Sequence, residues 1–60
     1  MNTKIEIGNT VTIQKPDDAY SGTVGIVMYD ARYSTGRYLD VRMADGSLRK
    51  YREAELNKMD

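Results

Sequence analysis

The sequence predicts a small all-β domain with five short strands, and three observations lead to this prediction. Apolar residues recur with a period of two rather than about 3.6, as the alternation of Val11 and Ile13 with threonines shows. Residues 23–29 are rich in β-branched and aromatic side chains, which are typical of strands. The segment 44–46 reads Ala-Asp-Gly, and its Asp-Gly pair marks a tight hairpin turn between two alternating strands.

The first predicted strand contains Val11 and Ile13 and ends before Pro16. Proline has no N–H to donate to a neighbouring strand, and the two aspartates that follow it favour a turn. A polar loop over 15–22 therefore separates the first two strands, and Tyr20 is its one aromatic residue.

The second predicted strand covers 23–29 and contains Gly25, a residue type that often marks a bulge inside a strand. With a bulge at Gly25, Val24 and Val27 both face the interior although they are three residues apart. Without a bulge, Val24 and Ile26 share a face. We favour the bulge, because a small barrel has to bend its long strands sharply.

The second half of the chain adds two strands joined by the predicted hairpin turn. Residues 30–37 form a second loop. Residues 38–43 form the third strand, with its Leu, Val and Met side chains on one face. After the turn at 44–46, residues 47–51 form the fourth strand, with Leu48 facing the interior.

The C-terminal segment allows two predictions. Residues 52–55 are good helix formers but make only about one turn, which suits a 3-10 turn. A short last strand through Leu56 and Asn57 then follows. A continuous helix over 50–60 is the alternative, although it carries only a thin apolar stripe. We favour the 3-10 turn and the strand.

Composition excludes several classes of function. The chain has no Cys and no His, which removes disulfides, thiolate metal sites and histidine-based catalysis. We therefore expect no enzyme activity, no metal and no cofactor. Nine basic residues balance nine acidic ones, and no apolar run approaches the roughly 20 residues of a membrane helix. We expect one cytoplasmic domain over 1–60 without membrane contact.

Five short strands in this loop order describe an SH3-like barrel, with its core at about 7–57. The segments 7–13 and 22–27 resemble the KOW-like pattern of a strand followed by G-x-x-G-x-V. The segment 51–56, YREAEL, resembles the close of several SH3-like barrels, among them a small barrel protein of photosystem I, the variable chain of ferredoxin–thioredoxin reductase and small phage barrels. The resemblance implies a barrel that binds RNA, binds proteins or supports an enzyme complex.

Tyrosines and arginines alternate around the two predicted loops, which lie together at one side of an SH3-like barrel. Tyrosine combines an apolar ring with a polar tip, and this combination suits interfaces. Tyr29, Tyr38 and Tyr51 are each expected to be mainly structural, because aromatic residues are usually buried, although Tyr38 lies beside the second loop. We predict a partner-binding surface made of Tyr20, Arg32, Tyr33, Arg37 and Tyr38.

A second group of basic residues lies around the predicted hairpin. Arg42 on the third strand and Arg49 on the fourth are expected to be neighbours on an outer face, across the turn at 44–46. Phosphate binding is one interpretation, and a solvated face paired with nearby acidic residues is the one we favour. The alternative nucleic-acid-binding set is Arg42, Arg49, Lys50 and Arg52.

The sequence thus predicts a small noncatalytic module that binds a protein partner, such as an accessory subunit or a phage-type modulator of a larger complex. Nucleic-acid binding in the KOW manner, to RNA or DNA, is the first alternative. An assembly subunit of an enzyme complex is the second. Steep weakening with salt distinguishes nucleic-acid binding from protein binding through tyrosines. The identity of the partner and the oligomeric state are left open.

Overall fold

The structure is a computed structural model that describes residues 4–59. Five antiparallel strands form one sheet in the order β4-β3-β2-β1-β5. The elements are β1 (Thr10–Ile13), β2 (Val24–Tyr33), β3 (Gly36–Met43), β4 (Leu48–Arg52), the 3-10 turn η1 (Glu53–Glu55) and β5 (Leu56–Lys58). The predicted all-β fold, its five strands and the 3-10 turn before the last strand are confirmed. The continuous helix considered for 50–60 is not formed.

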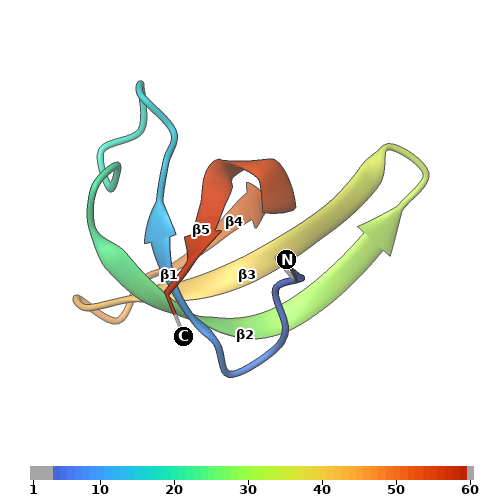
Figure 1. The fold of residues 1–60 in the computed structure, drawn as a ribbon, viewed down its shortest axis with the longest axis horizontal. Coiled ribbons are helices and arrows are strands. Elements are labelled where there is room, and N and C mark those ends of the chain that lie inside the picture. The colour runs from blue at the N-terminus through green and yellow to red at the C-terminus, as the bar shows by residue number, and fades with distance from the viewer. Residues whose placement is uncertain (1–3, 60) are drawn as a thin grey trace.

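The sheet is strongly curved, and β2 is the strand that carries the curve. Its first residues, Val24–Ile26, pair with β1, whereas β3 runs beside it from Gly25 to Tyr33. β1 also pairs with β5, and β3 pairs with β4 on its other side. Figure 1 shows that the sheet wraps around itself and that the far half of the β2–β3 hairpin projects to one side.

The core lies inside this curved sheet and takes alternate residues from the strands. β3 contributes three buried side chains at alternate positions, as its apolar period predicts. Ile5 comes from the N-terminal segment, before the stretch 7–57 that is predicted to hold the core, whereas Ile7 is exposed. The buried hydrophobic residues are Ile5, Val11, Ile13, Val27, Leu39, Val41, Met43, Tyr51 and Leu56.

β2 contains a bulge between Val27 and Tyr29, and not at Gly25. Its pairing with β3 is regular from Gly25 to Val27 and shifts only after that point. Gly25 and Val27 face the core, while Val24 and Ile26 share the exposed face. The predicted bulge at Gly25 is therefore wrong, and so is the inward position predicted for Val24.

The predicted loop over 30–37 is also wrong, because this segment is strand except at its turn. β2 continues to Tyr33 and β3 begins at Gly36, so residues 34–35 alone connect the two strands. On the inner face of this far half, Asp30 and Arg37 form an ion pair where other strands carry apolar residues. The apolar alternation that marks a strand is consequently missing from the sequence here.

Leu48 faces outward, which corrects the inward position predicted for it. In β4, Leu48 lies opposite Arg42 and Tyr51 lies opposite Leu39, so the two β4 side chains point to opposite faces. Leu48 is 56% exposed and Tyr51 is 1% exposed. The tyrosine ring, and not the leucine, is the contribution of β4 to the core.

Candidate protein-interaction face

Three strands bring tyrosines and basic residues together on the outer face of the sheet, the face turned away from the core. In the sheet register, Tyr29 and Lys50 lie on either side of Asp40. Arg52 lies opposite Tyr38 in the neighbouring row. Alternate residues of a strand share a face, so the side chains of β2 continue this surface toward the hairpin turn. We define the tyrosine–basic face as Tyr29, Tyr33, Tyr38, Lys50 and Arg52.

Direct contacts hold most of this face together. The rings of Tyr33 and Tyr38 pack edge to face, with centroids 5.4 Å apart and planes at 68°. Lys50 Nζ lies 5.2 Å from the Tyr33 centroid and donates a 3.1 Å hydrogen bond to the Tyr33 hydroxyl. The Arg52 guanidinium lies 5.3 Å from the Tyr38 centroid. Each cation–π contact at such an exposed site is worth about 0.5–1 kcal/mol. Together the contacts hold the side chains in place without burying them.

The tyrosine–basic face is exposed and positively charged. Tyr29 is 56% exposed and Tyr33 is 52% exposed. The hydrogen bond to Tyr33 raises the pKa of Lys50, which stays protonated at neutral pH. Among the outer-face residues of β2, β3 and β4 that the structure describes, Asp40 is the one acidic residue. An acidic partner would meet a favourable electrostatic field here.

Tyr29 belongs to this face, contrary to the expectation that it is mainly structural. That expectation rests on the usual burial of aromatic residues, and the sequence also predicts that the strand ends at this residue. The strand in fact continues, and Tyr29, Ala31 and Tyr33 alternate along it on the outer side. Their spacing of two is the signal in the sequence that could have placed them on one face.

Exposed apolar side chains extend the outer face away from the β2–β3 turn. Ile26, Arg42 and Leu48 lie in one row across β2, β3 and β4. Val24, Ile26 and Leu48 are each roughly half exposed, at 45%, 47% and 56%. A shallow hollow beside this row is lined in part by Val24, Ile26 and Arg42. The outer face therefore offers apolar contact area next to its tyrosines and cations.

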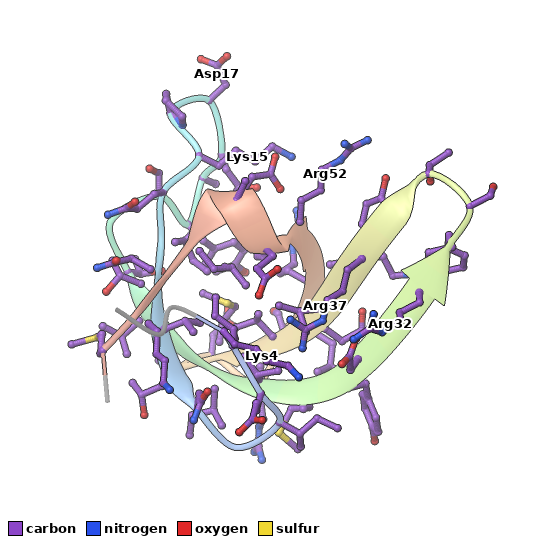
Figure 2. The ribbon with its side chains drawn as sticks, turned by 45° about the vertical axis from the view of Figure 1, so that its right-hand side comes forward. Lys4, Lys15, Asp17, Arg32, Arg37 and Arg52 are labelled. Atoms are coloured by element: carbon purple, nitrogen blue, oxygen red, sulfur yellow. The ribbon has the colours of Figure 1, made fainter. Side chains whose placement is uncertain are left out.

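Arg37 belongs to the inner side of the sheet, where hydrogen bonds use four of its five N–H donors. Its Nε and Nη2 bind the two carboxylate oxygens of Asp30 at 3.1 and 2.9 Å, and its Nη1 binds Glu53 at 2.7 Å. Its Nη2 also donates to the carbonyl oxygen of Ile5. The hydrogen bonds from Arg37 lower the pKa of Asp30. Figure 2 shows Arg37 pointing into the concave side, so this arginine ties the hairpin to η1 and to the N-terminal segment.

Arg32 also points away from the tyrosines. It lies opposite Arg37 in the β2–β3 register, on the inner face, and its side chain is exposed. Figure 2 shows Arg32 and Lys4 on the same concave side as Arg37. Neighbouring residues of a strand point to opposite faces, so Arg32 and Tyr33 cannot belong to one surface. The predicted surface of interleaved tyrosines and arginines is therefore divided between the two sides of the hairpin.

Tyr20 lies far from the other predicted tyrosines. Its hydroxyl donates a 2.8 Å hydrogen bond to Asp45 and lies 3.3 Å from the hydroxyl of Ser47, both at the β3–β4 turn. The Arg49 guanidinium lies 5.3 Å from its ring centroid. In Figure 1 the loop between β1 and β2 and the β2–β3 turn stand at opposite sides of the molecule. The expectation that the two loops lie together is wrong, because the second loop is the turn of a long hairpin.

The second basic group is also split between two faces. Arg42 lies opposite Leu48, and Arg49 lies opposite Val41, so the two arginines occupy opposite sides of the β3–β4 hairpin. Their predicted proximity on one outer face is wrong. Lys50 and Arg52 share the outer face with Arg42, whereas Arg49 packs over Tyr20. Three of the four basic residues thus remain on one surface.

Comparisons with protein-family models, with curated proteins and with solved structures give no significant match to this chain. Within residues 4–59, the structure has no helix with the length and apolar character that a membrane crossing requires. No cluster of three or more potential metal-ligating side chains occurs in the same range.

Proposed function

We propose that this protein is a noncatalytic interaction module that binds an acidic segment of a protein partner through its tyrosine–basic face. The observation that carries the proposal is the combination of two half-exposed tyrosine rings, Tyr29 and Tyr33, with the neighbouring cations Lys50 and Arg52 on one sheet surface. Tyrosine and arginine are the residue types that dominate the energetics of protein interfaces.

The apolar part of the outer face favours a protein over other ligands. Val24, Ile26 and Leu48 would offer contact area to apolar side chains of a partner, which nucleic acid lacks. The cations beside them supply specificity and a faster association with an acidic segment. A cytoplasmic location, expected from the composition, is part of this proposal.

Capture of partners with variant proteins tests the proposal. The double variant Tyr29→Ser/Tyr33→Ser removes the exposed rings, and we expect it to retain less than about one tenth of the captured partner, since two interface tyrosines often contribute more than about 2 kcal/mol. Asp17→Ser, in the loop at the far side of the molecule, is the control and should capture as the unchanged protein does. Circular dichroism verifies that both variants are folded. Equal capture by all three proteins would contradict the proposal.

Binding of single-stranded nucleic acid is the second candidate, and one observation favours it. Bases stack on aromatic rings while basic residues follow the phosphates, and here Lys50 and Arg52 lie directly beside Tyr33 and Tyr38. The four basic residues of the alternative set are divided between two faces, which lowers the number of phosphates that one strand could reach. A mobility shift with single- and double-stranded probes at low salt separates the candidates. The nucleic-acid candidate predicts a shifted single-stranded probe that added salt releases, and the protein candidate predicts no shift.

A role in the assembly of an enzyme complex is a special case of protein binding. It would use the same tyrosine–basic face, and the captured partner would then be an enzyme whose activity changes when the module is removed. Identification of the captured chain by mass spectrometry distinguishes this case from other protein partners.

A further inference from the structure

The last five residues of β2, 29–33, are arranged around Ala31 with matching tyrosines and opposite charges. Residues 29–33 read Tyr-Asp-Ala-Arg-Tyr, with tyrosines at both ends and opposite charges on either side of Ala31. The side chains of Asp30 and Arg32 lie on the inner face, and those of the two tyrosines lie on the outer face. Such a segment is complementary to an antiparallel copy of itself.

The same segment is an open edge of the sheet. β1 pairs with β2 only over Val24–Ile26, and the N-terminal segment then forms two backbone hydrogen bonds with Val27, from Gly8 N–H and to Asn9 C=O. Across the rest of the described chain, no backbone group pairs with 29–33 on the side away from β3. Figure 1 shows this half of the hairpin projecting clear of β1 and β5.

The hydrogen-bond pattern of the sheet determines which backbone groups point out from this edge. The N–H of Met43 donates to Ser47, on the side of β3 away from β2. Successive residues of a strand direct their backbone groups to opposite sides, so the even-numbered residues of β3, among them Asp40 and Arg42, bond toward β2. Their partners after the bulge are residues 29, 31 and 33. The N–H and C=O groups of Asp30 and Arg32 therefore point away from β3, toward the open edge.

We propose that a second copy of this chain adds to the open edge of β2, antiparallel and about a two-fold axis through Ala31. Asp30 of each copy then lies opposite Arg32 of the other, and each such pair exchanges two backbone hydrogen bonds. On the outer face, Tyr29 of each copy lies opposite Tyr33 of the other, which forms two aromatic cross-strand pairs. The result is a continuous sheet in which two tyrosine–basic faces lie side by side.

Charge and backbone direction select this register over its neighbours. A shift that brings Asp30 opposite its own copy, or Arg32 opposite its own copy, places like charges together. A shift by one residue places Asp30 and Arg32, whose backbone groups point to the open edge, opposite residues of the other copy whose backbone groups bond toward β3. In the proposed register the Asp30 carboxylate keeps its hydrogen bonds to Arg37 and has the second copy's Arg32 beside it.

Disulfide trapping tests the position of the axis. The chain has no Cys, so Ala31→Cys introduces a single thiol at the residue that would lie opposite its own copy. Paired residues of this kind have Cα atoms about 4.5 Å apart, within the range for a disulfide. With oxidised glutathione at low micromolar protein, we expect Ala31→Cys to form a covalent dimer at least about tenfold faster than Thr35→Cys, an exposed residue at the hairpin tip. Equal rates for the two variants would overturn the proposal.

Analytical ultracentrifugation of the cysteine-free protein tests whether the pairing occurs without a covalent bond. We expect reversible dimerisation with a dissociation constant that Arg32→Asp raises about tenfold or more and that Arg32→Lys changes by less than about threefold. A protein that stays monomeric up to about 1 mM, or a dimer that is equally stable in Arg32→Asp, would overturn the proposal. Both measurements use the isolated chain, so they fail or succeed independently of the protein partner proposed above.

Discussion

At the residue scale, Gly25 is the position where the core leaves no room for a side chain. It lies on the inner face of β2, opposite Met43. A Cβ atom built there would clash with the side chain of Val41 and would lie 2.9 Å from the carbonyl oxygen of Arg42 and 3.2 Å from Met43 Sδ. Glycine at this position lets the inner-face side chains of β3 pack directly against the backbone of β2, which is a different role from the bulge that a strand glycine first suggests.

Gly25→Val should therefore destabilise the protein more than Gly36→Val. The first variant forces three carbon atoms into a closed core, and overpacking of even smaller size costs about 1–3 kcal/mol. The second meets open space and incurs only the strain of a positive φ of 136°, about 1–3 kcal/mol at most. Urea unfolding curves give the comparison, and equal midpoints for the two variants would contradict the packing argument.

A second substitution identifies the neighbour that causes the strain at Gly25. Val41→Ala removes the side-chain atoms that the new Cβ would meet first. In a double-mutant cycle, Gly25→Ala should cost about 1 kcal/mol less in the Val41→Ala background than in the unchanged protein. Additive effects of the two substitutions, read from the same urea curves, would show that Val41 does not set the limit.

At the scale of the element, the β2–β3 hairpin explains which parts of the fold the sequence could predict. The C-terminal half of β3, from Leu39 to Met43, has apolar residues at alternate positions because its inner face is buried. This pattern predicts both the strand and the face that it buries. The far half has an ion pair of Asp30 and Arg37 on its inner face, and aspartate is depleted in strands. Its strands are held by backbone pairing and by the bonds of Arg37 to Glu53 and to the Ile5 carbonyl, and the alternation of apolar residues shows neither of these.

At the turn end of the β2–β3 hairpin, the bonds of Arg37 take the place of a hydrophobic core. The variant Arg37→Met tests whether these bonds stabilise the fold. Methionine keeps the length of the side chain but loses the bonds to Asp30, Glu53 and the Ile5 carbonyl, and loss of such charge-assisted bonds costs about 2 kcal/mol. Amide hydrogen exchange should accelerate first at Ile5, whose N–H binds Glu53. Arg32→Met, at a concentration where the chain is monomeric, is the control. Unchanged exchange at Ile5 would contradict this role.

At the scale of the whole molecule, the candidate site could not be assembled from the sequence because it depends on register. The residue types of the tyrosine–basic face are visible in the sequence, which marks Tyr33, Tyr38, Lys50 and Arg52 as candidates. Their grouping follows from which residue lies opposite which across three strands, and a bulge between Val27 and Tyr29 changes that relation by one position. A single undetected bulge is sufficient to move a residue to the other face of a sheet.

Three aspartates stabilise the fold through their ionised carboxylates, and this predicts how stability depends on pH. The pKa of Asp18 is lowered chiefly by the backbone N–H of Tyr20, that of Asp30 by Arg37, and that of Asp45 by the backbone N–H of Ser47. Because each pKa is lower in the folded state than in the unfolded state, the unfolded state binds more protons as acid is added. Stability should therefore be nearly constant between about pH 5 and 8 and fall as the pH drops below about 4.

Asp30→Asn separates one of these contributions from the others. The variant should be less stable than the unchanged protein at pH 7, where the ionised Asp30 binds Arg37 at two atoms. The difference should shrink below about pH 4, because the unchanged protein then loses the same charge by protonation. Urea midpoints from about pH 2 to 7 record both curves across this titration range. Asp17→Asn, at an exposed position of the β1–β2 loop, should run parallel to the unchanged protein. Curves for Asp30→Asn that stay parallel to it as well would show that the ion pair with Arg37 does not stabilise the fold.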